Sequence, residues 1–137
     1  MIGIVVVTHS GLGEALIEAA ESILEGPLGA ATAVSVDLSQ SAEKMRKKIG
    51  TGIKAVDQGK GVLILTDMFG GTPSNLSLSF LEEGRIEVLT GVNLPVLIRA
   101  AKMRKDKNLS EIAESVQAYG RKSISLASGV LKGNKRT

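Results

Sequence analysis

Cysteine and tryptophan are absent from this 137-residue chain, and aromatic residues make up only 2% of it. Without cysteine, the chain can form neither a disulfide framework nor a thiolate zinc site. So few aromatic side chains leave little to stack on nucleic-acid bases. The net charge of +3 equals that of three basic residues near the C-terminus, Lys132, Lys135 and Arg136, so the rest of the chain is close to neutral. Nucleic-acid binding is therefore not expected.

Long hydrophobic runs are missing as well. No apolar stretch approaches the roughly 18 residues needed to cross a membrane, and the N-terminus lacks the basic segment, apolar core and cleavage site of an export signal. These absences predict a soluble, cytoplasmic protein with no direct membrane insertion. The length suits one ordinary domain, which we place at residues 1–130, followed by a basic, disordered tail at 131–137.

Four short apolar runs indicate strands, at 2–8, 31–37, 61–67 and 86–92. The first three are nearly continuous, as in strands covered on both faces, and the fourth is more polar. Two sets of apolar residues with helical spacing lie between them: Leu12, Leu16, Ala19 and Ile23, and then Met45, Ile49, Ile53 and Val56. Strands that alternate with helices predict a doubly wound α/β domain, with a parallel sheet covered on both faces.

The C-terminal part begins with a capping-box pattern, because Asn108 is followed three residues later by Glu111. A helix should therefore start there. The alternating run KSISLAS at 122–128 then predicts a last strand with one polar face, added to the parallel sheet as an antiparallel edge strand.

Three unusual loops follow the predicted strands: THSG at 8–11, DMFGGTPSN at 67–75 and TGVNLP at 90–95. Right-handed crossovers bring the carboxyl ends of parallel strands to one edge of the sheet, where ligands bind in open α/β folds. In the strand order 2-1-3-4, the first and third strands are neighbours, so His9 faces Asp67. The only histidine of the chain and an acid that ends a buried strand thus define a candidate site.

The chemistry of this site has several possibilities. A histidine that donates one ring N–H to a carboxylate keeps a fixed lone pair on its other nitrogen, which can act as a general base, a metal ligand or a nucleophile. A metal would need more ligands than the loops offer beside Asp67, so no metal site is expected. A general base would need a hydroxyl nucleophile; the candidates Ser10, Thr72 and Ser74 lie in no elbow motif.

The nucleophile interpretation fits the neighbouring loop best. Gly70 and Gly71 allow backbone N–H groups to turn toward an anion, and Pro73 suits the first turn of a following helix. An anion hollow beside a nucleophilic imidazole suggests a phosphoryl group carried on histidine. The alternative, a purely structural histidine at a strand end, leaves the glycines and the acid unexplained.

A rival motif is the stretch GLGEAL at 11–16, which begins like a dinucleotide-binding turn. The third glycine of that motif would fall at Leu16, and Asp37 is only loosely placed for the acid that binds the ribose. Entry into a helix is a sufficient reason for these glycines. No cofactor is expected.

The three loops, in this order and at these spacings, resemble the enzyme IIA component of the mannose family of the bacterial phosphoenolpyruvate:sugar phosphotransferase system. DMFGGTPSN and TGVNLP are the most specific matches, and VVTHSG is less specific. The resemblance covers residues 1 to about 130, essentially the whole domain. It implies a phosphotransferase that accepts a phosphoryl group from the phosphocarrier protein HPr and passes it to enzyme IIB, on another polypeptide.

The resemblance also assigns roles to individual residues. His9 stands at the place of the phosphorylated histidine, and Asp67 would hold its imidazole. Gly71 and Thr72 would lie near the phosphate. Relatives form a homodimer that exchanges the last strand, which would be 122–128 here. Many relatives carry glycine directly after the histidine, whereas this chain has Ser10 there.

Two functions remain open at this point: a phosphoryl carrier for sugar uptake, and a stand-alone regulatory module whose phosphorylation state signals to a partner protein. Both use the same site, and the sugar cannot be read because a IIA component does not touch it. The phosphotransferase subunit of dihydroxyacetone kinase shares fold and histidine but ranks lower, since it is not expected to carry GGTPSN. We expect Phe69, in the loop beside the site, to be partly exposed and to contact a partner; the alternative is that it packs under the loop.

Overall fold

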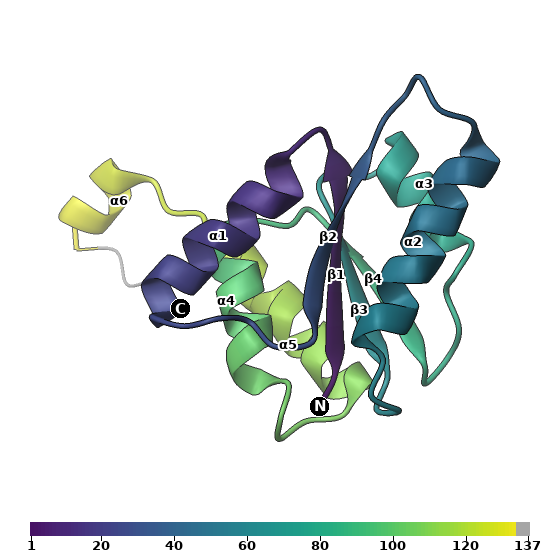
Figure 1. Ribbon diagram of the computed structural model, residues 1–137. Coiled ribbons are helices and arrows are strands. Elements are labelled where there is room, and N and C mark those ends of the chain that lie inside the picture. The colour runs from purple at the N-terminus through teal and green to yellow at the C-terminus, as the bar shows by residue number, and fades with distance from the viewer. Residues whose placement is uncertain (134–137) are drawn as a thin grey trace.

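The computed structural model describes residues 1–133. Within them, four parallel strands form one sheet in the order β2-β1-β3-β4 (Figure 1). The strands are β1 (Gly3–His9), β2 (Ala31–Val36), β3 (Val62–Thr66) and β4 (Ile86–Thr90). This arrangement confirms the predicted α/β class and strand order.

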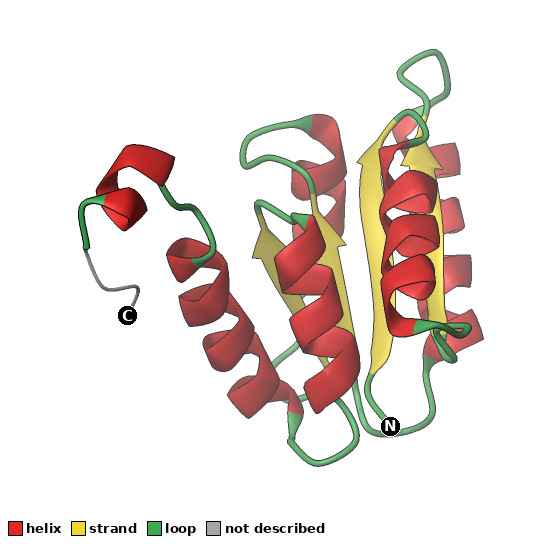
Figure 2. Ribbon diagram, turned by 90° about the vertical axis from the view of Figure 1, so that its left-hand side faces the viewer, coloured by secondary structure: helices red, strands yellow, loops and turns green. Residues whose placement is uncertain are grey.

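Helices cover both faces of the sheet. Their bounds are α1 (Leu12–Leu24), α2 (Ala42–Val56), α3 (Thr72–Leu78), α4 (Leu94–Met103), α5 (Leu109–Lys122) and α6 (Ala127–Leu131). Helices α1, α4 and α5 contribute to the apolar core on one face, and α2 and α3 contribute to the core on the other (Figures 1 and 2). The sheet is therefore the middle of three layers, and its strand ends are held from both sides.

The central strand β1 shows why the sequence reads as a continuous apolar run. Ile4 and Val6 belong to the core beneath α1, α4 and α5, while Val5 and Val7 belong to the core beneath α2 and α3. Successive side chains of a strand point to opposite faces, and here both faces are buried. All four side chains are inaccessible to solvent.

The structure confirms the patterns predicted for α2 and α5 but only part of the pattern predicted for α1. The predicted stripe of α2, from Met45 to Val56, is buried, and the capping box that opens α5 is formed. The predicted stripe of α1 is wrong in part, because Leu12 and Ile23 are 46% and 57% exposed and the buried residues are Gly13 and Ala20. A side chain at Gly13 would meet the carbonyl oxygen of Val6 at 3.1 Å, so α1 packs too close to the sheet for large residues there.

The antiparallel strand expected at 122–128 is not formed. Helix α5 continues to Lys122 and α6 begins at Ala127, and Ile124 and Leu126 between them are 81% and 77% exposed. A strand needs a neighbouring edge for its backbone hydrogen bonds, and the chain after α5 leads away from the sheet (Figure 2). The expected tail at 131–137 begins inside α6, and residues 134–137 lie outside the described part of the chain.

Gly3 fixes how closely α2 approaches the sheet and provides a test of the fold. A Cβ atom at Gly3 would lie 2.6 Å from Cγ2 of Val56 and closer still to the Val56 carbonyl oxygen. We expect Gly3→Ala to lower the free energy of unfolding by about 1–3 kcal/mol, because such overpacking forces the backbone to shift. Gly26→Ala is the matched control, since a Cβ there meets nothing within 4 Å. Equal changes for the two variants in urea unfolding would contradict this packing.

Candidate functional site

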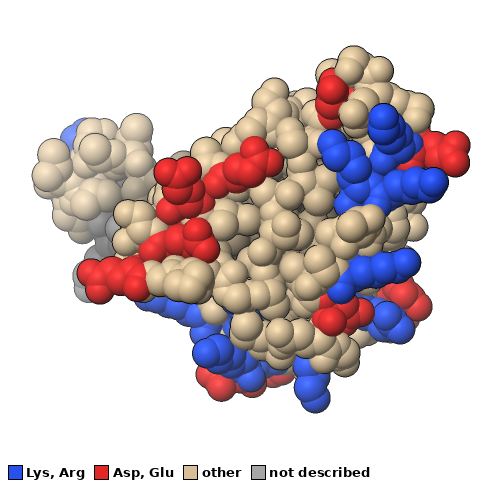
Figure 3. Space-filling view, viewed as in Figure 1, with Lys and Arg blue, Asp and Glu red and all other residues tan. Residues whose placement is uncertain are grey.

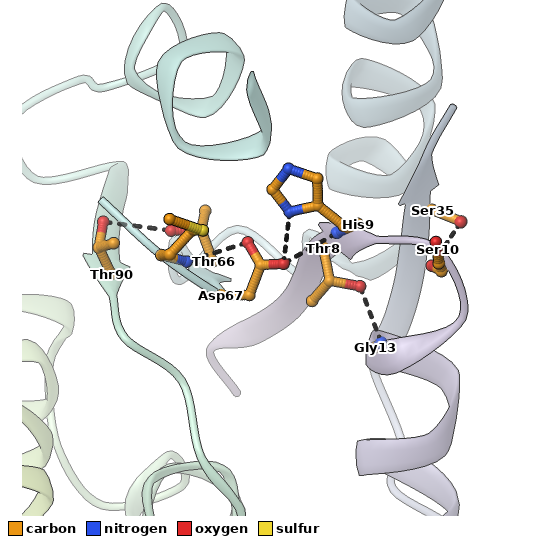
Figure 4. Close-up of polar contacts among 9 residues, drawn as sticks. Thr8, His9, Ser10, Gly13, Ser35, Thr66, Asp67 and Thr90 are labelled. Atoms are coloured by element: carbon orange, nitrogen blue, oxygen red, sulfur yellow. Dashed lines mark hydrogen bonds and ion pairs between the residues drawn. The ribbon is translucent and has the colours of Figure 1, made fainter. Parts of the chain in front are cut away.

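The site is built where β1 and β3 end side by side. His9 is the last residue of β1, and Asp67 directly follows β3. One carboxylate oxygen, Asp67 Oδ2, lies 2.7 Å from Nδ1 of the His9 ring and accepts a second hydrogen bond, at 2.9 Å, from the His9 backbone N–H (Figure 4). The parallel pairing of the two strands thus brings together the two residues predicted from their loops.

The same contact leaves one ring nitrogen available. An ionised carboxylate only accepts hydrogen bonds, so Nδ1 carries the proton and Nε2 keeps its lone pair. The His9 side chain is 36% exposed, whereas that of Asp67 is only 11% exposed. The arrangement presents one defined nitrogen of a half-exposed imidazole and keeps the orienting carboxylate covered.

The charge of Asp67 is maintained despite its burial. Burial alone would raise the pKa of its carboxyl group. The hydrogen bonds from the backbone and ring of His9, the attraction of that ring when it is protonated and the backbone N–H of Met68 together outweigh burial and hold the pKa below its ordinary value. Asp67 is therefore an anion at neutral pH and accepts from His9 throughout the physiological range.

The loop after β3 closes over the imidazole. A Cβ atom at Gly71 would lie 3.1 Å from Cε1 and 3.6 Å from Nε2 of His9, so a side chain there would press on the ring. Gly70 has a φ of +83°, a left-handed conformation that favours glycine. Thr72 begins α3 directly after Gly71, and the backbone N–H groups of a first helical turn have no acceptor within the helix.

The two serine candidates for a general-base mechanism are poorly placed. Ser74 is fully buried, and its Oγ has no hydrogen-bond partner among residues 1–133. Ser10 is exposed, with a φ of +48°, and it is held through its backbone carbonyl oxygen. Neither serine hydroxyl makes a hydrogen bond with the His9 ring, whose partner in the described structure is Asp67.

The turn from β1 into α1 is held by two residues that sequence reasoning missed. Buried Thr8 accepts a hydrogen bond on Oγ1 from the Gly13 backbone N–H at 2.8 Å, and the Ser35 hydroxyl donates to the Ser10 carbonyl oxygen (Figure 4). The signal that points to Ser35 is the strand register, since Ser35 lies opposite Thr8 in the pairing of β1 with β2. Both contacts fix the backbone on either side of His9.

Between residues 1 and 133, no three His, Cys, Asp or Glu side chains gather closely enough to hold a metal ion. None of the helices in that range combines the length and the apolar character that crossing a bilayer requires.

The fold and this pair of residues define a class: an α/β domain that presents one nitrogen of an oriented imidazole at the carboxyl edge of a parallel sheet. The family model described as "PTS system fructose IIA component", EIIA-man, matches residues 3–117. The chain therefore belongs to this family of IIA components of the phosphotransferase system. The resemblance inferred from the three loops is confirmed.

Individual relatives agree with this assignment. The chain is 29% identical over 129 residues to the fructose-specific EIIA component of Bacillus subtilis, covering 93% of this chain and 88% of that protein. It is 30% identical over 125 residues to the mannose-specific EIIAB component of Escherichia coli K12, covering 90% of this chain. The matched part is only 38% of that longer protein.

Solved structures show the same fold. Component EIIA from Streptococcus agalactiae superimposes with a TM-score of 0.82 at 24% sequence identity, covering 93% of this chain and 98% of that one. The mannose/sorbose specific IIA subunit from Enterococcus faecalis gives a TM-score of 0.80 at 23% identity, covering 91% and 93%.

The lowered pKa of Asp67 predicts how stability depends on pH. A carboxyl group whose pKa is lower in the folded state stabilises the fold above its unfolded-state pKa, about 3.9 for aspartate. The contribution is lost as the pH falls below that value toward the pKa of the folded state. We expect the free energy of unfolding of the wild type to fall more steeply over this acid range than that of Asp67→Asn. Urea unfolding at a series of pH values measures both slopes, and parallel curves would contradict the prediction.

Proposed function

We propose that this protein is a phosphoryl carrier that accepts phosphate on His9 from phospho-HPr and passes it to a IIB component for sugar uptake. The observation that carries the proposal is the contact of Nδ1 of His9 with Asp67, which leaves Nε2 free on a half-exposed ring. Family membership supports the phosphotransferase role. The catalytic residues of this proposal are His9 and Asp67.

The transfer is a displacement at phosphorus. The lone pair on Nε2 of His9 forms the new N–P bond, while the N–P bond to the donor imidazole breaks and its electron pair stays with the donor. The product ring on His9 is a cation protonated at Nδ1, and the Asp67 carboxylate stabilises it at hydrogen-bond distance. Attack by the acceptor residue of IIB then breaks the Nε2–P bond and restores the neutral ring. We invoke no cofactor or metal in either step.

The loop beside the ring supplies the proposed phosphate contacts. We assign the backbone N–H groups of Gly71 and Thr72, together with the Thr72 hydroxyl, as donors to the phosphoryl oxygens. The closeness of Gly71 to Nε2 and the start of α3 at Thr72 support this assignment. N–H groups at a helix start favour an anion, and the missing side chain at position 71 leaves room for it.

The partners are part of the same proposal. The name of the E. coli relative joins IIA and IIB in one protein, and we propose that a IIB component is the acceptor here as well. We also propose a cytoplasmic homodimer. The segment after α5 supports a dimer, because its apolar side chains Ile124, Leu126 and Leu131 are each more than three-quarters exposed.

Phosphorylation at His9 is the direct test of the function. Incubation with phosphoenolpyruvate, the general phosphotransferase enzyme and HPr should label the protein with an acid-labile, base-stable bond, as expected for phosphohistidine and not for a serine ester. Because His9 is the only histidine, His9→Ala should abolish the label. Thr72→Val, which removes a proposed phosphate contact but keeps the nucleophile, should slow labelling without preventing it. Label that persists in His9→Ala would overturn the proposal.

The rim of the site generates a prediction about docking. Phe69 is 77% exposed and Met68 is 56% exposed, which confirms that Phe69 is open to solvent. If Phe69 anchors a partner, Phe69→Ala should slow transfer from HPr by about tenfold or more, the loss typical of an aromatic hot spot. Its effect on the free energy of unfolding should stay within about 0.5 kcal/mol, as for other exposed positions.

Leu81→Ala is the control for this docking prediction, since Leu81 is 53% exposed but lies near the start of β4, at the opposite end of the sheet. Equal transfer rates for the two variants would show that Phe69 contacts no partner during transfer.

A further inference from the structure

Strand β2 has an open edge. It pairs with β1 on one side, and no strand between residues 1 and 133 pairs with its other side. The register places Ile4 opposite Ala31, and the Ile4 N–H donates to the Ala30 carbonyl oxygen. Alternate residues of a strand direct their backbone groups to opposite sides, so Ala31, Ala33 and Ser35 present N–H and C=O groups outward. On this side Lys48 Nζ makes a long contact with the Ser35 carbonyl oxygen, at 3.4 Å.

The open edge lies at the bottom of a groove. Helices α1 and α2 flank it, and the groove has a volume of about 560 Å³. On the α2 side its wall is made by the small residues Thr51, Gly52 and Ala55. A Cβ at Gly52 would lie 3.0 Å from Cγ2 of Val34, so α2 packs directly against the face of β2 that carries Val34.

The two sides of the groove carry opposite charges. Three lysines line it on the α2 side, Lys44, Lys47 and Lys48, whereas the charged residue on the α1 side is Glu14. Figure 3 shows the molecule from this side, with basic side chains gathered over α2, acidic side chains over α1 and uncharged surface between them. The acidic stripe continues along α1 with Glu18 and Glu21 and ends at the C-cap, Glu25; none of these three lines the groove.

We propose that the β2 groove binds an extended segment of a partner protein that carries acidic residues at alternate positions and adds to the sheet as a fifth strand. Main-chain hydrogen bonds to Ala31, Ala33 and Ser35 supply affinity that does not depend on sequence. Successive side chains of the added strand point to opposite faces. Acidic residues on one face meet the three lysines, and uncharged residues on the other face avoid the glutamates of α1.

The lysines also explain the selectivity of the groove. The three lysines stand on α2 beside the edge, so an uncharged strand that paired with β2 would take water from their ammonium groups without offering them a partner. An acidic side chain provides that partner. The same residues therefore exclude most strands and admit an acidic one.

One end of the groove lies beside the His9 site. Ser35 forms its upper end and holds Ser10, the neighbour of His9. Strand binding needs only the open edge and the charges beside it, so it does not require phosphoryl transfer at His9.

The test uses a short fluorescent peptide in which glutamate alternates with threonine, and fluorescence anisotropy with the full-length protein. A peptide of the same composition with its glutamates in one block is the control for charge alone. We expect the alternating peptide to bind at least about tenfold more tightly than the block peptide, with affinity that falls as salt screens the lysines. Equal affinities, or no binding at low salt, would overturn the proposal.

Two variants locate the binding. Lys47→Glu should weaken binding of the alternating peptide by about tenfold or more, whereas Lys54→Glu, the same charge change on α2 outside the groove, should change it by less than about twofold. Ala33→Pro removes one outward N–H and leaves the bonds to β1 intact, so it should abolish binding while far-UV circular dichroism stays unchanged. If the proline variant unfolds, hydrogen exchange of backbone amides in the wild-type protein provides the second test. The bound peptide should slow exchange of the Ala33 N–H, and an unchanged exchange rate there would overturn strand addition.

Discussion

A single carboxylate oxygen organises the site. Oδ2 of Asp67 accepts from both the backbone and the ring of His9, so it fixes where the last residue of β1 lies and which way its imidazole faces. Hydrogen bonds to charged groups contribute about 1.5–3 kcal/mol each. Together these two bonds exceed the entropic cost of fixing one side chain in a single rotamer. This pairing requires β1 and β3 to be neighbours with their carboxyl ends level. The doubly wound sheet meets that requirement, because β1 and β3 pair in parallel at its centre with Val7 opposite Thr66.

The turn between β1 and α1 contains a strained backbone conformation directly after His9, and neighbouring side chains stabilise it. Ser10 adopts a left-handed conformation, which costs a residue with a side chain about 1–2 kcal/mol. The hydrogen bond from Ser35 contributes about 1 kcal/mol, so it offsets much of that strain. Thr8 binds the first turn of α1 from the other side of His9. These contacts hold Ser10 in its left-handed conformation directly after His9.

The sequence was a good guide wherever burial on both faces or a loop motif left one solution. The near-continuous apolar runs of β1 and β3 predicted a parallel sheet, and the expected order 2-1-3-4 then predicted the meeting of His9 with Asp67. The C-terminal segment forms no strand within the single chain, because alternation at 122–128 indicates a strand only if an edge is within reach. The α1 stripe failed for a related reason: which helical face is buried depends on how closely the helix packs, and Gly13 allows a close approach. Ser35 carries no motif and emerges only from the register between two strands.

The central claim is that Asp67 orients His9 so that Nε2 is the nitrogen that carries the phosphoryl group. Nitrogen-resolved NMR of the protein labelled with ¹⁵N in histidine and phosphorylated through HPr tests this claim most directly, since the two ring nitrogens give separate signals and His9 is the only histidine. The account predicts coupling of phosphorus to Nε2 and a proton retained on Nδ1. Phosphate on Nδ1 would contradict it, because that nitrogen could not then donate to Asp67.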